Sequence, residues 1–219
     1  MIAKVDGRKR RSEVTRERIV VAMKSLIDDG NVAPTTEQIA QRASVSTRSV
    51  FFRFRDTAAL YLAVMDKVFD EIMPRIPPIP PTGPTLDRIH TFVERRSQVC
   101  EELRHYWRTG NVLFAQNPTI GARGEMARAI TRARIEETFA PEIGSLDSTV
   151  ARRLVDALST ASDYEVWDTM RRYQSRTYEE ARATLETLIL GAMIRFGAAP
   201  AEQAPPADQV PAARRTANG

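Results

Sequence analysis

The sequence predicts an all-α protein with a small amino-terminal module of three helices and a larger helical domain behind it. Three observations support this prediction. Apolar residues recur at three- and four-residue steps along most of the chain, without the alternation typical of strands. Residues able to cap a helix precede several of these periodic segments. Six of the thirteen prolines fall within residues 74–84, which indicates a stiff connector between the two parts.

The amino-terminal module is predicted to contain three helices, followed by a longer fourth. Apolar spacing indicates a first helix over about residues 14–29. Thr35 can accept a hydrogen bond from the backbone of Gln38, whose side chain can return one, and this capping-box pattern predicts a short second helix. Ser46 is a good N-cap for the third helix. The fourth is expected to begin near Asp56 and to end at the prolines.

The larger domain is predicted to be helical throughout. One long helix, or two with a kink, is expected from about residue 85, and the next over about 119–139. Asp147 and Thr177 can cap two further helices with broad apolar faces, the first continuing to Met170. From Gly197 onward, prolines among alanine and polar residues predict a disordered tail.

Composition excludes several classes of protein. Of the 219 residues 42% are apolar, but no apolar run approaches the roughly 18 to 20 residues of a membrane span, so no membrane association is expected. The single cysteine, Cys100, excludes an intrachain disulfide, and the amino terminus has no apolar signal core. We therefore expect a reduced, cytoplasmic protein.

No catalytic motif stands out. Glu102 and His105 have the Glu-x-x-His spacing of some metal ligands, and Asp87 and His90 repeat it. Both pairs fall in one apparently continuous segment, whereas such sites combine several helices, so surface residues on a polar face are the simpler interpretation. Cys100 lies on an apolar helical face and is expected in the core. We expect no metal, no cofactor and no enzymatic activity.

Positive charge is concentrated at the amino end. Residues 1–60 hold twelve Lys and Arg against seven Asp and Glu and so carry +5, whereas the remaining residues carry −1. An electropositive surface attracts polyanions and gains from counterion release, so this asymmetry favours nucleic acid bound through the amino-terminal segment. A solvated basic surface is the alternative interpretation.

Residues 35–60 have the pattern of a helix-turn-helix, in which two short helices flank a tight turn. Ile39 and Ala43 are expected to face the core, Val45 to fill the turn, and Val50 to hold the third helix against the first two. Hydroxyl and guanidinium side chains suited to base edges and phosphates would project from the third helix: Thr47, Arg48, Ser49 and Arg53.

This stretch resembles the TetR family of bacterial transcription regulators. The resemblance rests on TEQIAQRASVS at residues 36–46, on SVFFRFRD at 49–56, on Ala59-Leu60, and on Arg18-Ile19 with Ala22 in the first helix. It covers about a quarter of the chain. Ser44 replaces the glycine usual in the turn, Phe51 and Arg53 replace the usual Tyr and His, and Thr57 replaces the usual lysine. Phe51 and Thr57 weaken two phosphate contacts, which Arg48, Arg53 and Arg55 can offset.

The resemblance implies a homodimer whose two DNA-binding heads lie about one DNA turn apart, roughly 34 to 36 Å, on a near-palindromic operator. The residues expected to contact double-stranded DNA are Thr35, Thr36, Arg42, Ser46, Thr47, Arg48, Ser49, Phe51, Phe52, Arg53 and Arg55, with the basic arm Arg8, Lys9, Arg10 and Arg11. The arm could instead be a solvated tail. The expected dimer interface is Leu154, Leu158, Leu185, Leu188, Ala192 and Phe196, for which intrachain core is the alternative.

Large side chains of the second part could line a site for a small hydrophobic or aromatic effector, although aromatic residues at helical spacing are more often core. The candidates are Phe92, Arg96, Tyr106, Trp107, Asn111, Phe114, Asp163, Tyr164, Trp167 and Met170. The expected function is that of a ligand-responsive repressor. An activator or ligand-free regulator of the same fold, or a helical protein with a catalytic or protein-binding role, are the alternatives.

Together these observations divide the chain into six segments. They are a disordered basic arm (1–12), a helix-turn-helix DNA-binding domain (13–56), a connecting helix (57–73), a proline-rich connector (74–84), an effector-binding and dimerisation domain (85–197) and a disordered tail (198–219).

Overall fold

The computed structural model describes residues 7–114 and 117–198, with side chains from residue 10 to 112 and from 117 to 198. These residues are all-helical, as the sequence predicts, and form ten α-helices, one 3₁₀ turn and one π turn. They divide into two compact units, which differ from the predicted segments because the long helix α5 (Thr85–Phe114) contributes to both. The first unit comprises described residues within 1–77 and 103–125, and the second those within 78–102 and 126–219.

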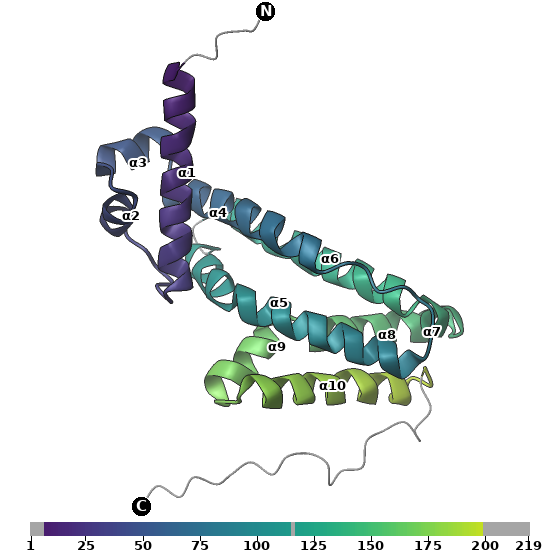
Figure 1. The fold of residues 1–219 in the computed structure, drawn as a ribbon. Coiled ribbons are helices and arrows are strands. Elements are labelled where there is room, and N and C mark those ends of the chain that lie inside the picture. Colours follow the sequence, from purple (N-terminus) through teal and green to yellow (C-terminus); the bar gives the residue numbers. More distant parts are fainter. Residues whose placement is uncertain (1–6, 115–116, 199–219) are drawn as a thin grey trace, which may run out of the picture. The chain divides into compact units, whose positions relative to one another are not determined.

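The first unit contains the predicted helix-turn-helix (Figure 1). Helix α1 packs against α2 and α4, and α2 packs against α3. Ile39, Ala40, Ala43 and Val50 are buried in this packing, whereas Val45 in the turn is half-buried. The elements are α1 (Gly7–Asp28), α2 (Thr36–Ala43), α3 (Thr47–Arg53), α4 (Thr57–Ile72) and the 3₁₀ turn η1 (Met73–Arg75).

Helix α1 begins earlier than the sequence predicts. Residues 7–12, expected in a disordered arm, form its first turns, and the Thr15 hydroxyl donates to the carbonyl of Arg11 at 2.9 Å. The side chain of Arg53 on α3 donates to the carbonyl of Ser12 at 3.3 Å, which ties this end of α1 to the module. Arginine and lysine extend an existing helix at little cost, so the packed part of α1 is sufficient to propagate these turns.

Helix α2 ends in a left-handed turn at Ser44, where φ is 53° and ψ is 50°. The backbone amide of Val45 donates to the carbonyl of Ala40 at 2.9 Å, which closes the helix end. Arg18 of α1 donates to the carbonyl of Ala43 at 2.6 Å, so an acceptor without a partner inside the helix is satisfied. This turn sets the direction in which α3 leaves α2.

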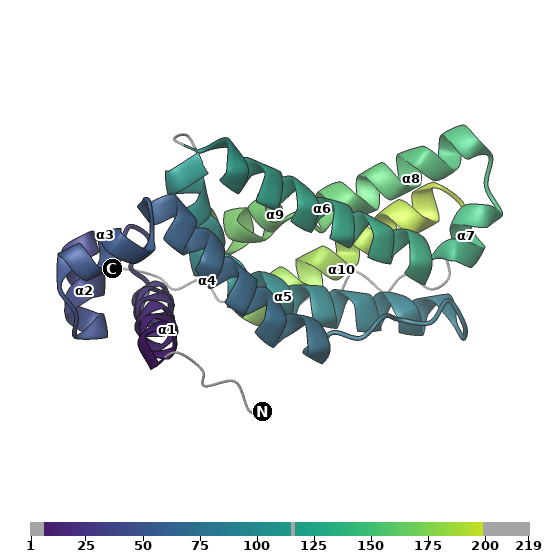
Figure 2. The ribbon, with the colours of Figure 1, turned by 90° about the horizontal axis from the view of Figure 1, so that it is seen from above.

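The second unit is built from the remaining helices, and α8 packs against α10 within it (Figure 2). Residues 76–84 contain no helix, whereas Pro74 and Arg75, predicted as the start of the proline-rich connector, belong to the 3₁₀ turn η1. The elements after α5 are α6 (Pro118–Thr138), whose last part belongs to this unit, α7 (Ala140–Gly144), α8 (Ser148–Ala161), α9 (Tyr164–Asp168), the π turn η2 (Thr169–Tyr173) and α10 (Tyr178–Arg195).

One helix boundary in this unit corrects the sequence prediction. The helix expected to run from Asp147 to Met170 is interrupted after Ala161, because the carboxylate of Asp163 accepts from the amide of Glu165 and starts α9 separately. The end of α6 at Thr138 agrees with the predicted helix over about 119–139, and Pro141 lies in the first turn of α7, where a proline needs no amide hydrogen.

The core of the second unit contains three residues predicted for the dimer interface. Leu154 and Leu158 are completely buried and Leu185 is 2% exposed, all within one chain. These contacts favour the intrachain alternative for the three leucines, and their contact with a partner stays a prediction. Ala192 and Phe196 are half-buried against the same core, and Leu188 is 42% exposed.

A buried ion pair joins α5 to α7. Both side chains are less than a tenth exposed, and the guanidinium of Arg88 donates to both carboxylate oxygens of Glu142, one of them at 2.8 Å. The Thr85 hydroxyl also donates to this carboxylate, at 2.6 Å. Burial alone would raise the pKa of Glu142, but the hydrogen bonds from Arg88 and Thr85 outweigh it, and the pKa lies below its ordinary value. Breaking such a pair leaves a buried charge and costs about 3–5 kcal/mol.

Replacing Ser44 with glycine is expected to raise the free energy of unfolding by about 0.5–1 kcal/mol, measured by chemical denaturation. A left-handed backbone strains any residue with a Cβ, and glycine relieves this strain. Part of the gain in stability is offset, because glycine has more conformational freedom in the unfolded chain. Ser44→Ala is the control, because it keeps the Cβ and should not stabilise. Equal stability of the glycine and alanine variants would show that no strain resides at this turn.

Candidate nucleic-acid interface

The recognition face, defined here as the outward side of α3, is set by two buried residues. Val50 and Phe54 are each 5% exposed and anchor α3 and its C-terminal end in the first unit. The hydroxyl of Ser46 accepts from the amide of Ser49 at 3.2 Å and fixes the helix start. The opposite side is therefore turned to solvent, and it exposes Thr47, Arg48, Phe51 and Phe52.

Arg48 is the cation on this face best placed for an external partner. It is exposed, and its side chain has neither a hydrogen bond nor an ion pair with the described part of the chain. Thr47, one residue before it, is also exposed. A guanidinium without an internal partner keeps all of its donors available, and it can form a bidentate contact to guanine or to a phosphate.

Arg53 is more constrained than the sequence predicts. Its side chain is half-buried, and it donates to the carbonyl of Ser12 at 3.3 Å and to that of Ser49 at 3.4 Å. Its guanidinium lies 5.8 Å from the ring centroid of Phe52. Arg53 thus joins α3 to α1, and part of its donor capacity is already used inside the protein.

Other predicted contact residues also stabilise the module. The hydroxyl of Thr35 accepts from the amide of Gln38 at 3.3 Å, and the capping box predicted from the sequence is present. The hydroxyls of Ser46 and Ser49 lie 3.0 Å apart in a hydrogen bond, whereas Thr36 is half-buried. These hydroxyl groups order the helix starts, and their contact with DNA stays a prediction.

The remaining predicted arginines differ in their surroundings. Arg42 forms an ion pair with Asp29 at 2.9 Å and so ties α2 to the end of α1. The side chain of Arg55 is 84% exposed and forms an ion pair with Asp56 at 3.0 Å. The amide of Ala59 and then Arg55 donate to Asp56 and lower the pKa of this carboxyl. Such an exposed pair contributes at most about 1 kcal/mol, so Arg55 can exchange it for a phosphate.

The predicted basic arm is described only in part. Arg10 and Arg11 are exposed on the first turns of α1, whereas the side chains of Arg8 and Lys9 lie outside the described residues. Of the predicted disordered tail, 198–219, Ala198 is buried in the core of the second unit, and residues 199–219 lie outside the described residues. Sequence reasoning missed the structural role of Arg18. The open carbonyls at the end of α2 were the available signal, because every helix end needs donors from elsewhere.

Comparison with protein families decides the identity of this module. Residues 19–64 match the family of bacterial regulatory proteins named tetR. Residues 19–64 form a TetR-family domain. The match runs from the buried part of α1 through the helix-turn-helix into α4 and confirms the resemblance found in the sequence. Comparison of the chain with curated proteins gives no significant match.

A helix-turn-helix domain of the TetR family implies DNA binding and a role in transcription regulation. Among the described residues, no group of three or more His, Cys, Asp or Glu side chains is arranged to hold a metal ion. His90 instead pairs with Glu186 at 2.8 Å, and His105 accepts from Arg104 at 3.1 Å. In the part of the chain that is described, none of the helices has the length and apolarity needed to cross a membrane.

The residues predicted to bind an effector fall into both units of the structure. Those in the first unit are Tyr106, Trp107, Asn111 and Phe114, and those in the second are Phe92, Arg96, Asp163, Tyr164, Trp167 and Met170. Phe114 has a side chain outside the described set, Asn111 is exposed and Trp107 is half-buried. The buried Tyr106 donates from its hydroxyl to Asp28 of α1, and burial followed by this bond raises the pKa of its phenol.

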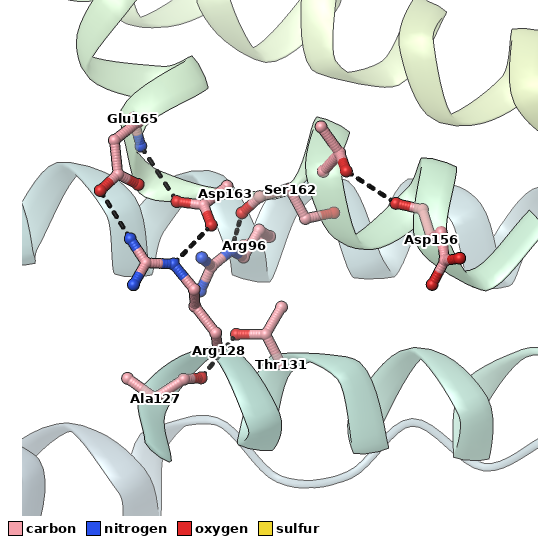
Figure 3. A network of polar contacts seen from close by, with 9 residues as sticks. Arg96, Ala127, Arg128, Thr131, Asp156, Ser162, Asp163 and Glu165 are labelled. Atoms are coloured by element: carbon pink, nitrogen blue, oxygen red, sulfur yellow. Dashed lines mark hydrogen bonds and ion pairs between the residues drawn. The ribbon is translucent and has the colours of Figure 1, made fainter. Parts of the chain in front are cut away.

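Two of the candidates in the second unit, Arg96 and Asp163, lie at the break between α8 and α9, beside Ser162 and Glu165 (Figure 3). Arg128 of α6 donates to Asp163 at 2.8 Å and to Glu165 at 2.6 Å. Arg96 of α5 donates to the carbonyl of Ser162 at 2.7 Å. Burial and then the neighbouring Asp163 raise the pKa of Glu165 to about 7.

An aromatic cluster lies directly after this break. Trp167 and Met170 are buried with Cys100, and the Trp167 indole donates to Glu101 at 3.0 Å. Arg171 donates to both oxygens of Glu101 at 3.0 Å. Tyr164 and Phe92 are also buried, the latter packed edge-on against Phe139. These contacts place the candidates in the core of one chain, and their contact with an effector stays a prediction.

Replacing Arg48 with alanine is expected to weaken binding to a duplex selected from a random pool by about 1–3 kcal/mol if it contacts a base. Thermal stability should stay unchanged, because Arg48 has no partner among the described residues. Arg53→Ala should lower both the affinity and the stability, the latter by about 1 kcal/mol through its bond to Ser12. Gel shifts across salt concentrations and thermal unfolding measure the two effects.

Arg152→Ala is the matched control, because Arg152 is an exposed arginine on α8 outside the TetR-family domain. It removes the same charge and should leave DNA affinity nearly unchanged. Equal losses in Arg48→Ala and Arg152→Ala would show that only net charge matters and would contradict the assignment of Arg48.

Proposed function

We propose that this TetR-family regulator is a repressor that binds a near-palindromic operator as a homodimer and is released by a small hydrophobic or aromatic effector. The observation that carries the DNA-binding part is the recognition face, where Thr47 and Arg48 are exposed on a helix whose other side is buried. A helix held in this way can enter a major groove without reorganisation. A regulator of bacterial DNA acts where the DNA is, so the proposal places it in the cytoplasm.

The proposed DNA contacts follow from the exposure of each side chain. Arg48 and Thr47 would contact base edges, while Arg55, Arg10 and Arg11 would contact phosphates, being exposed cations of the same unit. Arg53 would contribute through the donors that Ser12 and Ser49 leave unused. The remaining predicted contacts, which we keep as weaker members of the interface, are Thr35, Thr36, Arg42, Ser46, Ser49, Phe51, Phe52, Arg8 and Lys9.

The short length of α3 supports the homodimer. Its seven residues extend over about 10 Å, which covers only about three base pairs of a groove. Two heads on one symmetrical operator double the number of base contacts, as in other helix-turn-helix dimers. Leu188 of α10 is an exposed leucine with exposed Thr184 and Gly191 on the same side of the helix, which is where we place the partner. Ala192 and Phe196 would complete this interface.

Selection from random duplex DNA with the full chain is expected to yield an inverted repeat whose half-site centres lie about 34–36 Å apart. Sedimentation should show a dimer, and Leu188→Glu should weaken dimerisation by at least about tenfold, because a carboxylate would be desolvated at the interface. Tyr173→Glu is the control, since Tyr173 is an exposed aromatic residue on another element of the same unit. A monomer that retains no duplex at low salt would overturn the proposal.

The effector part of the proposal is supported by the surroundings of the α8–α9 break. Buried aromatic and apolar side chains meet charged groups there, a combination suited to an effector with an aromatic body and a polar substituent. The π turn η2 follows immediately, and such turns are frequent at functional sites. We therefore place the site in the second unit, near Arg96, Asp163, Tyr164, Trp167 and Met170, with Phe92 behind them in the core.

A panel of small aromatic compounds, screened for release of the selected duplex, tests this placement. Trp167→Phe keeps an aromatic ring but loses the bond to Glu101, so release should require about tenfold more compound at unchanged DNA affinity. Trp107→Phe is the comparison, since Trp107 is the half-buried tryptophan of the first unit. Impaired release in Trp107→Phe alone would place the site in the first unit, and a panel without effect would favour a ligand-free regulator.

A further inference from the structure

The recognition face has an apolar component that hydrogen bonding to DNA does not explain. Phe51 is 60% exposed and Phe52 is 82% exposed, although both lie on a helix of seven residues with a buried opposite side. The fold does not require apolar residues here, because Val50 and Phe54 already supply the contacts to the core. Two adjacent exposed phenyl rings are typical of a surface that becomes covered by a partner.

The charges around these rings indicate the class of partner. The segment from Thr47 to Arg55 contains three arginines and no acidic residue. The guanidinium of Arg53 lies 5.8 Å from the ring centroid of Phe52 and is itself held by backbone carbonyls, so it limits the positions open to the ring. An apolar surface bordered by fixed cations fits a polyanion with apolar groups on its surface, and the major groove of DNA has such groups.

We propose that Phe52, supported by Phe51, reads the C5-methyl group of thymine in the major groove. The proposal rests on the DNA-binding function proposed above and adds the chemical group that is recognised. Thymine is the base that places a methyl group in the major groove of unmodified DNA, and phenylalanine is a side chain that contacts it. The rings would then gain apolar contact on binding where they now face water.

Helix geometry places the methyl contact close to the contact of Arg48. Residues four apart lie on one side of a helix, so Arg48 and Phe52 share a side, and Thr47 and Phe51 share the neighbouring one. The four-residue step advances about 6 Å along the axis, the length of about two base pairs. The thymine read by Phe52 therefore lies within about two base pairs of the position read by Arg48.

Replacing thymine by uracil, which removes only the methyl group, tests the proposal. The duplex selected by the wild-type protein is resynthesised as a series. In each member, deoxyuridine replaces thymine at one position, in both half-sites. Affinities are measured by fluorescence anisotropy. At one or more positions near the Arg48 contact, the wild type should lose about fourfold in affinity per methyl group, from the free energy of burying one such group. Phe52→Ala should bind thymine and uracil duplexes equally there.

Three controls separate this role from others. Phe52→Ala should unfold at the wild-type temperature, because the ring is 82% exposed. Tyr173→Ala removes another exposed aromatic ring and should keep the full sensitivity to uracil. Replacing a cytosine elsewhere in the selected duplex by 5-methylcytosine should not restore affinity lost at a thymine position, because the contact is to a methyl group at one position of the half-site.

The possible failures are distinguishable. A wild type that binds its selected duplex but is insensitive to uracil at every position overturns the methyl contact and leaves the proposed function intact. Equal sensitivity to uracil in the wild type and Phe52→Ala assigns the methyl effect to another residue and also overturns it. If the wild type selects no duplex at all, the proposed function fails and this inference fails with it.

Discussion

Burial of Val50 and Phe54 is the constraint on which the DNA-binding surface depends. A seven-residue helix is too short to be stable alone, so α3 exists because these side chains are covered by the rest of the first unit. Their four-residue spacing leaves one possible outward side, which carries Thr47, Arg48 and the exposed phenylalanines. The caps at Ser46 and the left-handed turn at Ser44 then fix the ends of the helix. Stability and recognition are therefore divided between opposite sides of one short element.

The arginines of this module serve two purposes, and local acceptors decide which. Arg18 donates to the carbonyl of Ala43, Arg42 pairs with Asp29, and part of Arg53 is taken by Ser12. Each of these holds the three helices in position. Arg48 has no such acceptor among the described residues and stays available. The charge of +5 in the first 60 residues therefore overstates the charge available to DNA. A guanidinium that is bound internally has fewer N–H donors left for DNA, and its side chain is less free to move.

Sequence reasoning succeeded where the cause is local. The caps at Thr35, Ser46, Asp147 and Thr177 depend on residues two or three positions away, and all four are present. It failed where contacts with residues distant in the sequence determine the position of a side chain. An apolar stripe on a helix looks alike whether it meets its own chain or a partner, so Leu154 and Leu158 could not be assigned to the core. The partner of Arg18 likewise lies far away in sequence, at Ala43.

The second unit contains ion pairs of very different strength, and this difference determines which part of the unit rearranges more easily. Arg88 and Glu142 are both less than a tenth exposed, so separating them leaves an unpaired charge buried in the protein. Arg128 and Glu165, by contrast, are nearly half exposed, and water can replace each partner at little cost. The first pair holds α7, and the second holds the α8–α9 break. The geometry of the break is therefore easier to change than the position of α7, and the break leads directly into the helix of Trp167.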